Sequence, residues 1–437
     1  MTSKTNLEIF IPHEREGEYF TIPFEMPADT ASLTLSYHYD RYTRDDSTLE
    51  NGSFTPRVKV NIIDLGLVAA DGSQVGASGS DKSSFTLSAT AATPGYTPHP
   101  LTPGQWQILV GAYKVAASGV TVTYELEFTP KQLHLYKGDI HTHTLASDGV
   151  LTAEELGRHA LRHGLDFLAI TDHNQMVSTA ALPRIPGITL IPGVEWTHYQ
   201  GHATFLGADQ PYDAPFFTNT VEDARARFIS AHERGALISI AHPFEESCPF
   251  KFEMGSLPFD CLEVWNGPMR ESNLRAVGFW LQLLATGKKI PITGGSDYHR
   301  DALFQILGGP CMGVYALSDS PTDLLSAIKQ GHSYISFAPN GPILSTTCGL
   351  AMMGDTCTLA EGLTLNIHAD GLKTGDVVRI LSADGNRDLL QAPVDGICEL
   401  EVPMDKPGFI AVQILRTFLP GIPPLPALLS NPIYFER

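Results

Sequence analysis

The sequence predicts a mixed α/β protein made of three parts. In the first part, apolar and polar residues alternate with a period of two, which is typical of β-strands. The second part alternates short apolar runs with helical segments, which indicates parallel β/α units. In the third part the helical pattern fades into further strands. The predicted parts are residues 1–134, 135–338 and 339–437, which also fits a 437-residue chain at about 150 residues per domain.

The N-terminal part is expected to be an antiparallel β-sandwich with long loops. Between Val120 and Phe128, apolar residues alternate with Thr and Glu, as in a strand with one buried face. Residues 33–39 repeat this pattern with Leu and Tyr. Gly, Pro and Ser gather in 72–84 and 92–104, which are expected to be loops between strands.

The middle part is expected to contain buried strands that are linked by helices and closed into a barrel. Thr152 and Glu155 form a capping box at the start of one helix, and Gly164 stands where that helix should end. Such alternation favours a β/α barrel. Strands are predicted at 165–170, 188–194, 202–206, 237–241, 261–264 and 290–293, and further helices at 220–234, 270–286 and 321–330.

The C-terminal part is expected to be a small β-domain. After Gly331, residues 363–368, 377–381 and 409–415 have strand character. Turns rich in Gly, Asp and Pro separate these runs, so short connections between neighbouring strands are predicted.

The charge balance excludes some classes of partner. The chain has 48 Asp and Glu against 29 Lys and Arg, which gives a net charge of -19 with neutral His. A general affinity for nucleic-acid polymers or anionic membranes is therefore not expected, although a local pocket can still take a small anion. No apolar run approaches the ~18 residues of a membrane span.

The cytoplasm is the expected location. Residues 1–6 lead into polar sequence and show no basic stretch followed by an apolar run, so no secretion signal is predicted. The six Cys are scattered without a C-x-x-C pair, which favours reduced thiols and excludes a Cys-rich zinc site. The chain also has sixteen His, and His is both the commonest metal ligand and an ordinary surface residue.

Five short polar clusters carry the candidate chemistry, and each contains His, Asp or Glu near the end of a predicted strand. They lie at 139–143 with 147–149, 171–174, 193–196 with 201–202, 240–243 and 294–299. In the first, His141 and His143 stand two apart, so on a strand both imidazoles face one side and can reach one ion. Enzymes of the α/β class place their ligands at such strand ends.

Each cluster alone has an ordinary explanation as a capped turn, a buried hydrogen-bonded histidine or a surface carboxylate. Five in succession, each near a predicted strand end, are hard to explain in that way. Together they favour a metal centre at one end of the predicted barrel.

In their order along the chain, these clusters resemble the PHP (polymerase and histidinol phosphatase) superfamily. The shared motifs are H-x-H, S-D-G, T-D-H, G-V-E, H-P and S-D-x-H, which together with their context cover residues 136–299. Segments 136–139, 164–167, 195–197 and 430–434 are similar to the CehA/McbA branch of that superfamily. The resemblance implies a distorted (β/α)7 barrel and a metal-dependent phosphoesterase.

The resemblance also implies nine metal ligands in three sets. The first ion would be held by His141, His143, Glu195 and Asp297. Glu195 would bridge to a second ion bound by His202 and His242, and a third ion would be bound by Asp148, His173 and His299. These ligands offer nitrogen and oxygen and no thiolate, which leaves two to three ions of Zn, Mn or Fe open.

The residues implied as catalytic are Glu195, His242, Asp297 and His299. A carboxylate that bridges two cations lets a shared water fall in pKa to near neutrality, so a metal-bridging hydroxide is the expected nucleophile.

Substrate contacts are expected from residues near the ligands. Arg300 and Arg270 are expected to bind phosphate by bidentate contacts, and His198 is expected to line the pocket. An ordinary surface or helix-face position stays open for both arginines. Asp139 and Asp172 stand beside ligand histidines and are expected to orient imidazoles.

Three functions stay open from the sequence. The leading one is a phosphoesterase that acts on a small phosphate ester. A carbamate, ester or amide hydrolase of the CehA type is the second, because a nucleophile that attacks phosphorus can also attack a carbonyl. A non-catalytic metal-binding module is the third. The expected partner is a small phosphorylated molecule rather than a nucleic-acid polymer or a membrane, and the oligomeric state is open.

Overall fold

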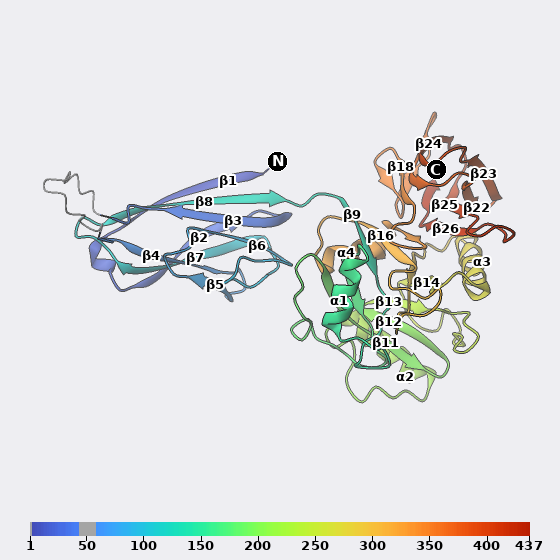
Figure 1. The fold of residues 1–437 in the computed structure, drawn as a ribbon, viewed down its shortest axis with the longest axis horizontal. Coiled ribbons are helices and arrows are strands. Elements are labelled where there is room, and N and C mark those ends of the chain that lie inside the picture. Colours follow the sequence, from blue (N-terminus) through green and yellow to red (C-terminus); the bar gives the residue numbers. More distant parts are fainter. Residues whose placement is uncertain (1, 43–57) are drawn as a thin grey trace. The chain divides into compact units, whose positions relative to one another are not determined.

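The computed structural model describes residues 2–42 and 58–437. The chain divides into two compact units, Met1–Gln132 and Leu133–Arg437, whose elements are labelled in Figure 1. The proposed boundary between residues 338 and 339 lies inside the second unit, so the division into three domains stays a prediction. Within the described residues, no helix has the length and apolar character that a membrane crossing requires.

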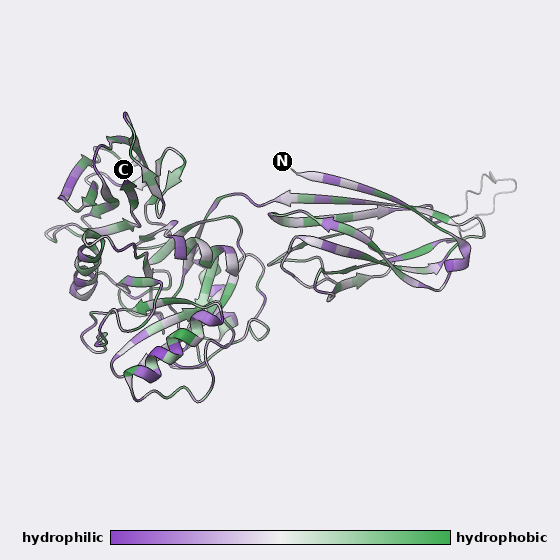
Figure 2. Cartoon of the chain, turned by 180° about the vertical axis from the view of Figure 1, so that it is seen from behind, coloured by the Kyte–Doolittle hydropathy of each residue, from purple (hydrophilic) through white to green (hydrophobic). Residues whose placement is uncertain are grey.

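The described residues of the first unit form two antiparallel four-stranded sheets around one apolar core. The sheets have the orders β1-β8-β3-β6 and β2-β7-β4-β5. Along β8, the apolar positions from Val120 to Phe128 are buried in alternation with more exposed ones, as the period of two predicts, and Figure 2 shows this banding on the long strands. The elements are β1 (Ser3–Ile11), the 3-10 helix η1 (His13–Arg15), β2 (Tyr19–Met26), β3 (Thr30–His38), β4 (Ile62–Val68), β5 (Gln74–Ser78), β6 (Ser84–Ser88), β7 (Gly104–Lys114) and β8 (Val120–Pro130).

The second unit has a mixed α/β fold with one large sheet and few helices. Its strands follow the hydrogen-bonded order β15-β14-β13-β12-β11-β10-β9-β16-β17-β26-β25-β22-β23. The site-bearing half consists of β9 (His134–Asp139), β10 (Phe167–Ile170), β11 (Thr189–His198), β12 (Gly201–Leu206), β13 (Leu237–Ala241), β14 (Cys261–Asn266) and β15 (Ile292–Gly295). The path continues through β16 (Cys311–Ala316), β17 (Ser333–Ser336), β22 (Val377–Ser382), β23 (Gly385–Gln391), β25 (Gly408–Arg416) and β26 (Leu425–Ser430).

The expectation of parallel strands throughout the middle part is wrong at β12. The pairs β9–β10, β10–β11, β13–β14 and β14–β15 are parallel, but β12 runs antiparallel to both β11 and β13. Only residues 199 and 200 separate β11 from β12. A connection of two residues can join only antiparallel neighbours, because a parallel crossover needs about a dozen residues or more.

Four α-helices follow the predicted positions closely. They are α1 (Ala153–Arg162), α2 (Val221–Glu233), α3 (Glu271–Ala285) and α4 (Pro321–Gln330). The capping box of α1 is confirmed, since Thr152 accepts from the backbone of Glu155 while the Glu155 side chain accepts from the backbone of Thr152. Gly164 has a φ of 81°, which favours glycine just beyond a helix end.

The large sheet curls so that β15 comes beside β16 and β17 in its middle. The backbone N–H of Gly294 on β15 lies 3.2 Å from the sulfur of Met312 on β16. A Cβ at Gly294 would lie 2.7 Å from Ile335 on β17, so the absence of a side chain permits this approach.

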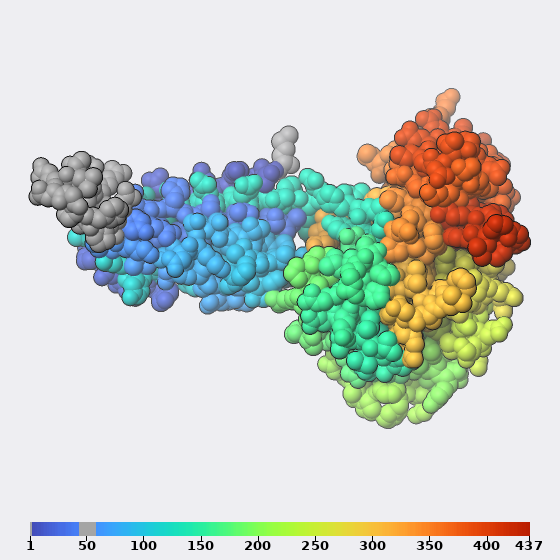
Figure 3. Space-filling model, viewed as in Figure 1, coloured from blue at the N-terminus to red at the C-terminus, as the bar shows by residue number. Residues whose placement is uncertain are grey.

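The C-terminal residues add strands to the same unit. The remaining elements are β18 (Ile343–Cys348), β19 (Ala351–Met352), β20 (Thr356–Thr358), β21 (Thr364–Leu372), β24 (Gly396–Pro403) and β27 (Ile433–Glu436). Their apolar side chains share a core with β22, β25 and β26, and Figure 3 shows residues beyond about 340 gathered in one lobe of this unit. The strands predicted at 363–368, 377–381 and 409–415 fall in β21, β22 and β25.

Candidate metal centre

Three buried side chains and one partly buried side chain converge just beyond the ends of β9 and β15 and beside Glu195 of β11. The atoms that meet are His141 Nε2, His143 Nε2, Glu195 Oε2 and Asp297 Oδ1. Each imidazole nitrogen lies 3.0 to 3.5 Å from both carboxylate oxygens. Among the described residues, none of these four buried atoms makes a hydrogen bond, although His173 Nδ1 also lies 2.8 Å from Glu195 Oε2.

This geometry fits a divalent cation. An unpaired polar atom in the interior is costly, so four of them at one point indicate a missing charge partner. Tetrahedral ligands at about 2.0–2.2 Å from an ion lie about 3.3–3.6 Å from one another, and most of the observed separations are close to that range. The four residues therefore form a set that could hold a metal ion.

The backbone brings the first and last motifs together. The amide of Asp297 donates to the carbonyl of His141 at 2.9 Å, and the amide of His143 donates to the carbonyl of Tyr298 at 2.9 Å. A Cβ at Gly295 would lie 2.5 Å from the Cβ of His141, so a glycine is required at that point of β15. Segments more than 150 residues apart in the sequence are thus fixed side by side.

A second group lies on the other side of Glu195. The second carboxylate oxygen of Glu195, Oε1, is 2.9 Å from His202 Nδ1 and 3.1 Å from His242 Nε2. Potential ligand atoms of His202, His242 and Cys248 all lie within 4.8 Å of one another. Glu195 is completely buried between the two groups, as a bridging carboxylate would be. Cys248 is not among the ligands that the resemblance implies, and its Sγ lies 3.7 Å from His242 Nδ1.

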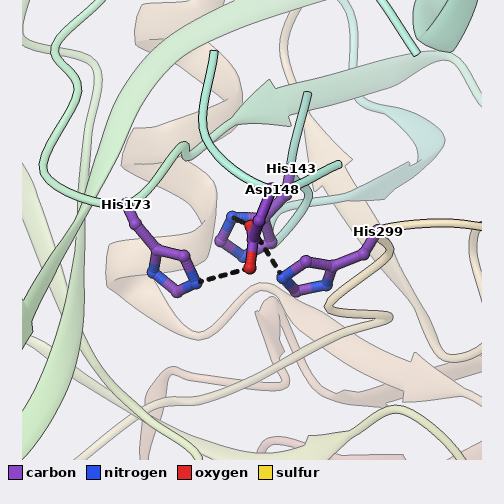
Figure 4. Close-up of side chains that lie close together, drawn as sticks. All are labelled: His143, Asp148, His173 and His299. Atoms are coloured by element: carbon purple, nitrogen blue, oxygen red, sulfur yellow. Dashed lines mark ion pairs between the residues drawn. The ribbon is translucent and has the colours of Figure 1, made fainter. Parts of the chain in front are cut away.

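A third group is more open to solvent. It consists of His143, Asp148, His173 and His299, whose potential ligand atoms lie within 4.8 Å of one another. Figure 4 shows His173 and His299 on either side of Asp148, with His299 Nε2 at 3.1 Å and His173 Nε2 at 3.7 Å from its oxygens. The Nδ1–H of His299 donates to the carbonyl of Asp297 at 2.8 Å, which leaves Nε2 facing Asp148.

Exposure increases from the first group to the third. His143 and Glu195 are 0% exposed, whereas the side chains of His299, His173 and Asp148 are 25%, 29% and 57% exposed. The first group is therefore the floor of the site, and the third group is the side from which a substrate can approach.

The buried carboxylates stay ionised because histidines surround them. Burial raises the pKa of Glu195, but His141, His173 and His202 outweigh it and hold that pKa well below its usual range. Burial also raises the pKa of Asp297, but His141 and His143 outweigh burial, so that this pKa too lies below its usual range. The floor of the site therefore presents anionic oxygens at neutral pH, which attract a cation.

Two backbone strains coincide with the proposed ligands. His242 and Asp297 have φ values of 26° and 51°, in the left-handed region that few residues other than glycine adopt. Such strain is of order 1–3 kcal/mol per residue and tends to occur at functional sites.

Glu263 is a residue of this site that the sequence reasoning missed. It lies on β14 and is 3% exposed, with Oε1 at 3.1 Å from His141 Nδ1. Its Oε2 accepts the backbone N–H of His242 at 2.8 Å. The available signal was a single acid inside an otherwise apolar buried strand.

Contrary to the expectation, the hydrogen bonds that Asp139 and Asp172 make among the described residues go to backbone amides and hydroxyls rather than to imidazoles. Asp139 is completely buried and accepts the backbone N–H groups of Ser296 and Gly308 and the hydroxyl of Ser296, and burial raises its pKa to about 6. Asp172 accepts the Thr144 amide and hydroxyl and the Ser147 hydroxyl, each at 2.7 Å. Both carboxylates hold the loops that carry the ligands.

The three expected substrate contacts have different surroundings. Arg300 Nη2 lies 3.4 Å from the carbonyl of Asp148, at the exposed side. Arg270 Nη2 lies 2.9 Å from Asn266 Oδ1 and 3.1 Å from Glu245. His198 stacks on Trp196, with ring centroids 5.4 Å apart, and its nitrogens contact backbone groups of Thr218 and Gln200. Their roles stay predictions.

The chain is similar to known proteins over limited stretches. No protein-family model matches it. A protein named 5'-3' exoribonuclease Rnm from Salmonella typhimurium is 37% identical over 119 residues, which is 22% of this chain and 40% of that protein. Its namesake from Escherichia coli is 36% identical over 105 residues, 21% of this chain and 36% of that protein. The chain thus spans less than half the length of these relatives.

Several solved structures are loosely similar, and one of them illustrates the extent of the likeness. That structure is a two-domain protein from Bacteroides vulgatus, described as containing a predicted PHP-like metal-dependent phosphoesterase. It is 16% identical, covers 64% of this chain and 90% of its own, and has a TM-score of 0.40. A likeness at that score is too loose to show a shared fold.

Proposed function

We propose that the chain is a metal-dependent phosphoesterase of the PHP superfamily, in its CehA/McbA branch, with residues 135–338 as a distorted (β/α)7 barrel. The observation that carries the proposal is the convergence of four buried, unpartnered ligand atoms at the floor of the site, from His141, His143, Glu195 and Asp297. The nine ligand residues implied by the motifs all fall within the three groups, and they surround Glu195.

The chemistry follows from what the side chains would hold. Divalent ions bound there would lower the pKa of a water toward neutrality and polarise the phosphoryl group, which is the usual contribution of two-metal sites. Glu195 and Asp297 keep their negative charge on the floor and would hold the ions. His299 lies at the exposed side, where it would be next to an entering ester. His242 is the fourth residue proposed as catalytic, with Glu195, Asp297 and His299.

Arg300 is proposed as the main phosphate contact. It reaches the Asp148 backbone at the exposed side of the site, where a substrate phosphate would enter. A guanidinium there can bind two phosphate oxygens with one planar fork. Arg270 is proposed to bind the phosphate as well, once its ion pair with Glu245 has opened. His198 is proposed to line the pocket.

The first test is the variant Glu195→Gln. An amide keeps the shape of the side chain but cannot supply the charge shared by both groups of imidazoles. We expect loss of bound metal, measured by elemental analysis, and loss of phosphoesterase turnover. Glu436→Gln, which removes a surface carboxylate paired with Lys289, should leave both unchanged. Full activity of Glu195→Gln would refute the proposal.

The similarity to proteins named exoribonuclease favours one further candidate reaction, the hydrolysis of a phosphodiester at an RNA end. The net charge of -19 weighs against tight binding of a long polyanion. A panel of an aryl phosphate, a bis-aryl phosphate, an aryl carbamate and a short oligoribonucleotide, each with metal-reconstituted protein, separates the reactions. Turnover of the carbamate alone would establish the CehA-type hydrolase instead.

The same substrate panel addresses the non-catalytic alternative, and metal analysis tests the site itself. A binding module would hold metal without hydrolysing any member of the panel. Fewer than about one ion per chain after supplementation would contradict the site itself, because two or three ions are expected from the three groups.

A further inference from the structure

Asn266 is a buried amide that contacts two carboxylates of the site at once. It is the last residue of β14, is 2% exposed, and pairs with Gly295 of β15, which stands two residues before Asp297. Its Nδ2 lies 3.3 Å from Asp297 Oδ2 and 3.3 Å from Glu263 Oε2. An amide nitrogen carries two N–H bonds, so Asn266 can donate one to each carboxylate.

Neighbouring groups fix which way this amide faces. Its Oδ1 accepts a hydrogen bond from Arg270 Nη2 at 2.9 Å, and a guanidinium can only donate. With oxygen and nitrogen exchanged, an acceptor would face two carboxylates and a donor would face Arg270. The backbone is held as well, because Asn273 Oδ1 accepts the Asn266 N–H at 3.1 Å and Asn273 Nδ2 donates to the Asn266 carbonyl at 3.0 Å. The N–H groups of the Asn266 side chain are therefore directed at the carboxylates.

The two carboxylate oxygens of Asp297 have different surroundings. Oδ1 lies 3.5 Å from His141 Nε2 and 3.0 Å from His143 Nε2, whereas Oδ2 accepts from Asn266. The backbone of Asp297 is fixed separately, since its N–H donates to the His141 carbonyl at 2.9 Å and its carbonyl accepts from Gln305 Nε2 at 3.0 Å. The contact with Asn266 therefore sets the rotation of the carboxylate rather than the path of the chain.

We propose that Asn266 is a positioning residue that makes Asp297 a metal ligand through one oxygen. The inference rests on the proposed metal-dependent function and adds a residue that the motifs do not contain. By donating to Oδ2, the amide engages the oxygen that could otherwise share the ion, and only Oδ1 is presented beside the imidazoles. A carboxylate that binds through one oxygen leaves a further position on the ion open for water or substrate, as catalytic metal sites require.

A double-mutant cycle in the full-length protein tests the inference. Asn266→Ala removes the amide, and we expect the affinity for Zn²⁺, measured by competition with a chelator, to fall about 10- to 100-fold. In the background of Asp297→Ala, the same change should lower the affinity by less than about 2-fold, because the residue through which Asn266 acts is gone. An equal loss in both backgrounds would overturn the inference, since Asn266 would then act by another route, such as Glu263.

Asn431→Ala is the matched control for a merely structural role. Asn431 is also a buried amide of the second unit, 1% exposed, which accepts the Ile292 N–H at 2.8 Å and donates to the Ser333 carbonyl at 3.0 Å. Both Asn266→Ala and Asn431→Ala should lower the denaturation midpoint of the metal-free protein, but Asn431→Ala should keep the wild-type affinity for Zn²⁺. An equal loss of affinity in Asn431→Ala would contradict a specific role of Asn266.

A structure of the zinc-reconstituted wild type needs no variant. We expect Asp297 Oδ1 at about 2.0–2.2 Å from an ion, with Oδ2 still within hydrogen-bonding distance of Asn266 Nδ2. Both Asp297 oxygens on one ion, or Oδ2 turned away from the amide, would overturn this inference and leave the metal-dependent function in place. A chain that takes up no zinc would overturn both.

Discussion

Glu263 contacts two of the clustered histidines at once. Its Oε1 lies 3.1 Å from the Nδ1 of His141, and its Oε2 accepts the backbone N–H of His242 at 2.8 Å. A carboxylate opposite Nδ1 holds the imidazole proton there and leaves Nε2 free for an ion. One side chain therefore sets the orientation of the first group and anchors the strained backbone of the second.

We predict that Glu263→Gln weakens metal binding without unfolding the protein. The amide keeps the volume of the side chain but removes the negative charge opposite His141. Loss of such a partner lowers metal affinity or activity about 10- to 100-fold. Chelator competition measures the affinity, and circular dichroism checks the fold. Affinity equal to that of the wild type would show that the contact does not orient His141 for an ion.

The metal-ligand candidates could be predicted from the sequence because each stands in a short motif near a strand end. Glu263 could not, because it lies inside a strand and no neighbouring residue marks it. Cys248 was overlooked for another reason. It is six residues from His242 in a loop, and only the folded path of that loop returns the thiol to the imidazole.

At the scale of elements, the helices and the central strands were predictable, while their direction was less so. The strand at Leu237–Ala241 matches its predicted range, because a run that is apolar except for Ser239 and stands between a helix and a His-Pro motif leaves little freedom. The antiparallel direction of β12 was missed because a buried antiparallel strand can have the same apolar composition as a parallel strand. Strand β5 was missed because its Gly and Ser residues have the composition of a loop.

Asp260 ties four elements of the second unit together. It immediately precedes β14. Its carboxylate accepts hydrogen bonds from the Ile238 amide of β13 and from the His232 imidazole of α2, each at 2.9 Å. Lys329 of α4 lies 3.0 Å from its other oxygen. Burial raises the pKa of Asp260, but these three partners outweigh burial and lower that pKa below its ordinary value of 3.8.

We predict that Asp260→Asn lowers the free energy of unfolding at neutral pH by about 1.5–3 kcal/mol, the range for hydrogen bonds to a charged group. Because the folded pKa is depressed, the contribution is fully present above about pH 3.8 and is lost as the pH falls through the lower folded value. Denaturant unfolding in a chelator, from pH 6 downward, measures the difference between variant and wild type.

The matched control for this variant is Asp213→Asn, which removes an exposed ion pair with Arg234. It should change stability by about 0–1 kcal/mol. If the difference between Asp260→Asn and wild type stayed constant into the acid range, the charge of Asp260 would not be the source of its effect.

For the whole molecule, the net charge and the proposed site have opposite signs. The chain carries -19, and the site contributes three of its acids, Asp148, Glu195 and Asp297. With Glu263 behind His141 as a fourth acid, three divalent ions would exceed the combined charge and make the site locally positive, whereas two would only balance it. A small phosphate ester is therefore favoured at the site, whereas the remaining surface repels a long polyanion.

Metal binding should also distinguish the two compact units. Every proposed ligand lies in Leu133–Arg437, and Met1–Gln132 has an apolar core of its own. A ligand that binds only the native state stabilises it by about 2.7 kcal/mol when its free concentration is 100 times Kd. We therefore predict two calorimetric unfolding transitions in the full chain. Added Zn²⁺ should raise the midpoint temperature of the transition that belongs to the second unit and leave the other midpoint unchanged.

The variant Trp106→Phe assigns the other transition. Trp106 is fully buried in the core of the first unit, and its Nε1–H donates to the Thr102 carbonyl at 2.9 Å. Its replacement removes apolar contacts and one hydrogen bond, which together should destabilise that unit by about 1–3 kcal/mol. The variant should lower the midpoint temperature of the zinc-insensitive transition and leave that of the zinc-sensitive transition unchanged. If zinc and Trp106→Phe shifted one common transition, the units would unfold cooperatively, and the metal centre would stabilise the entire chain.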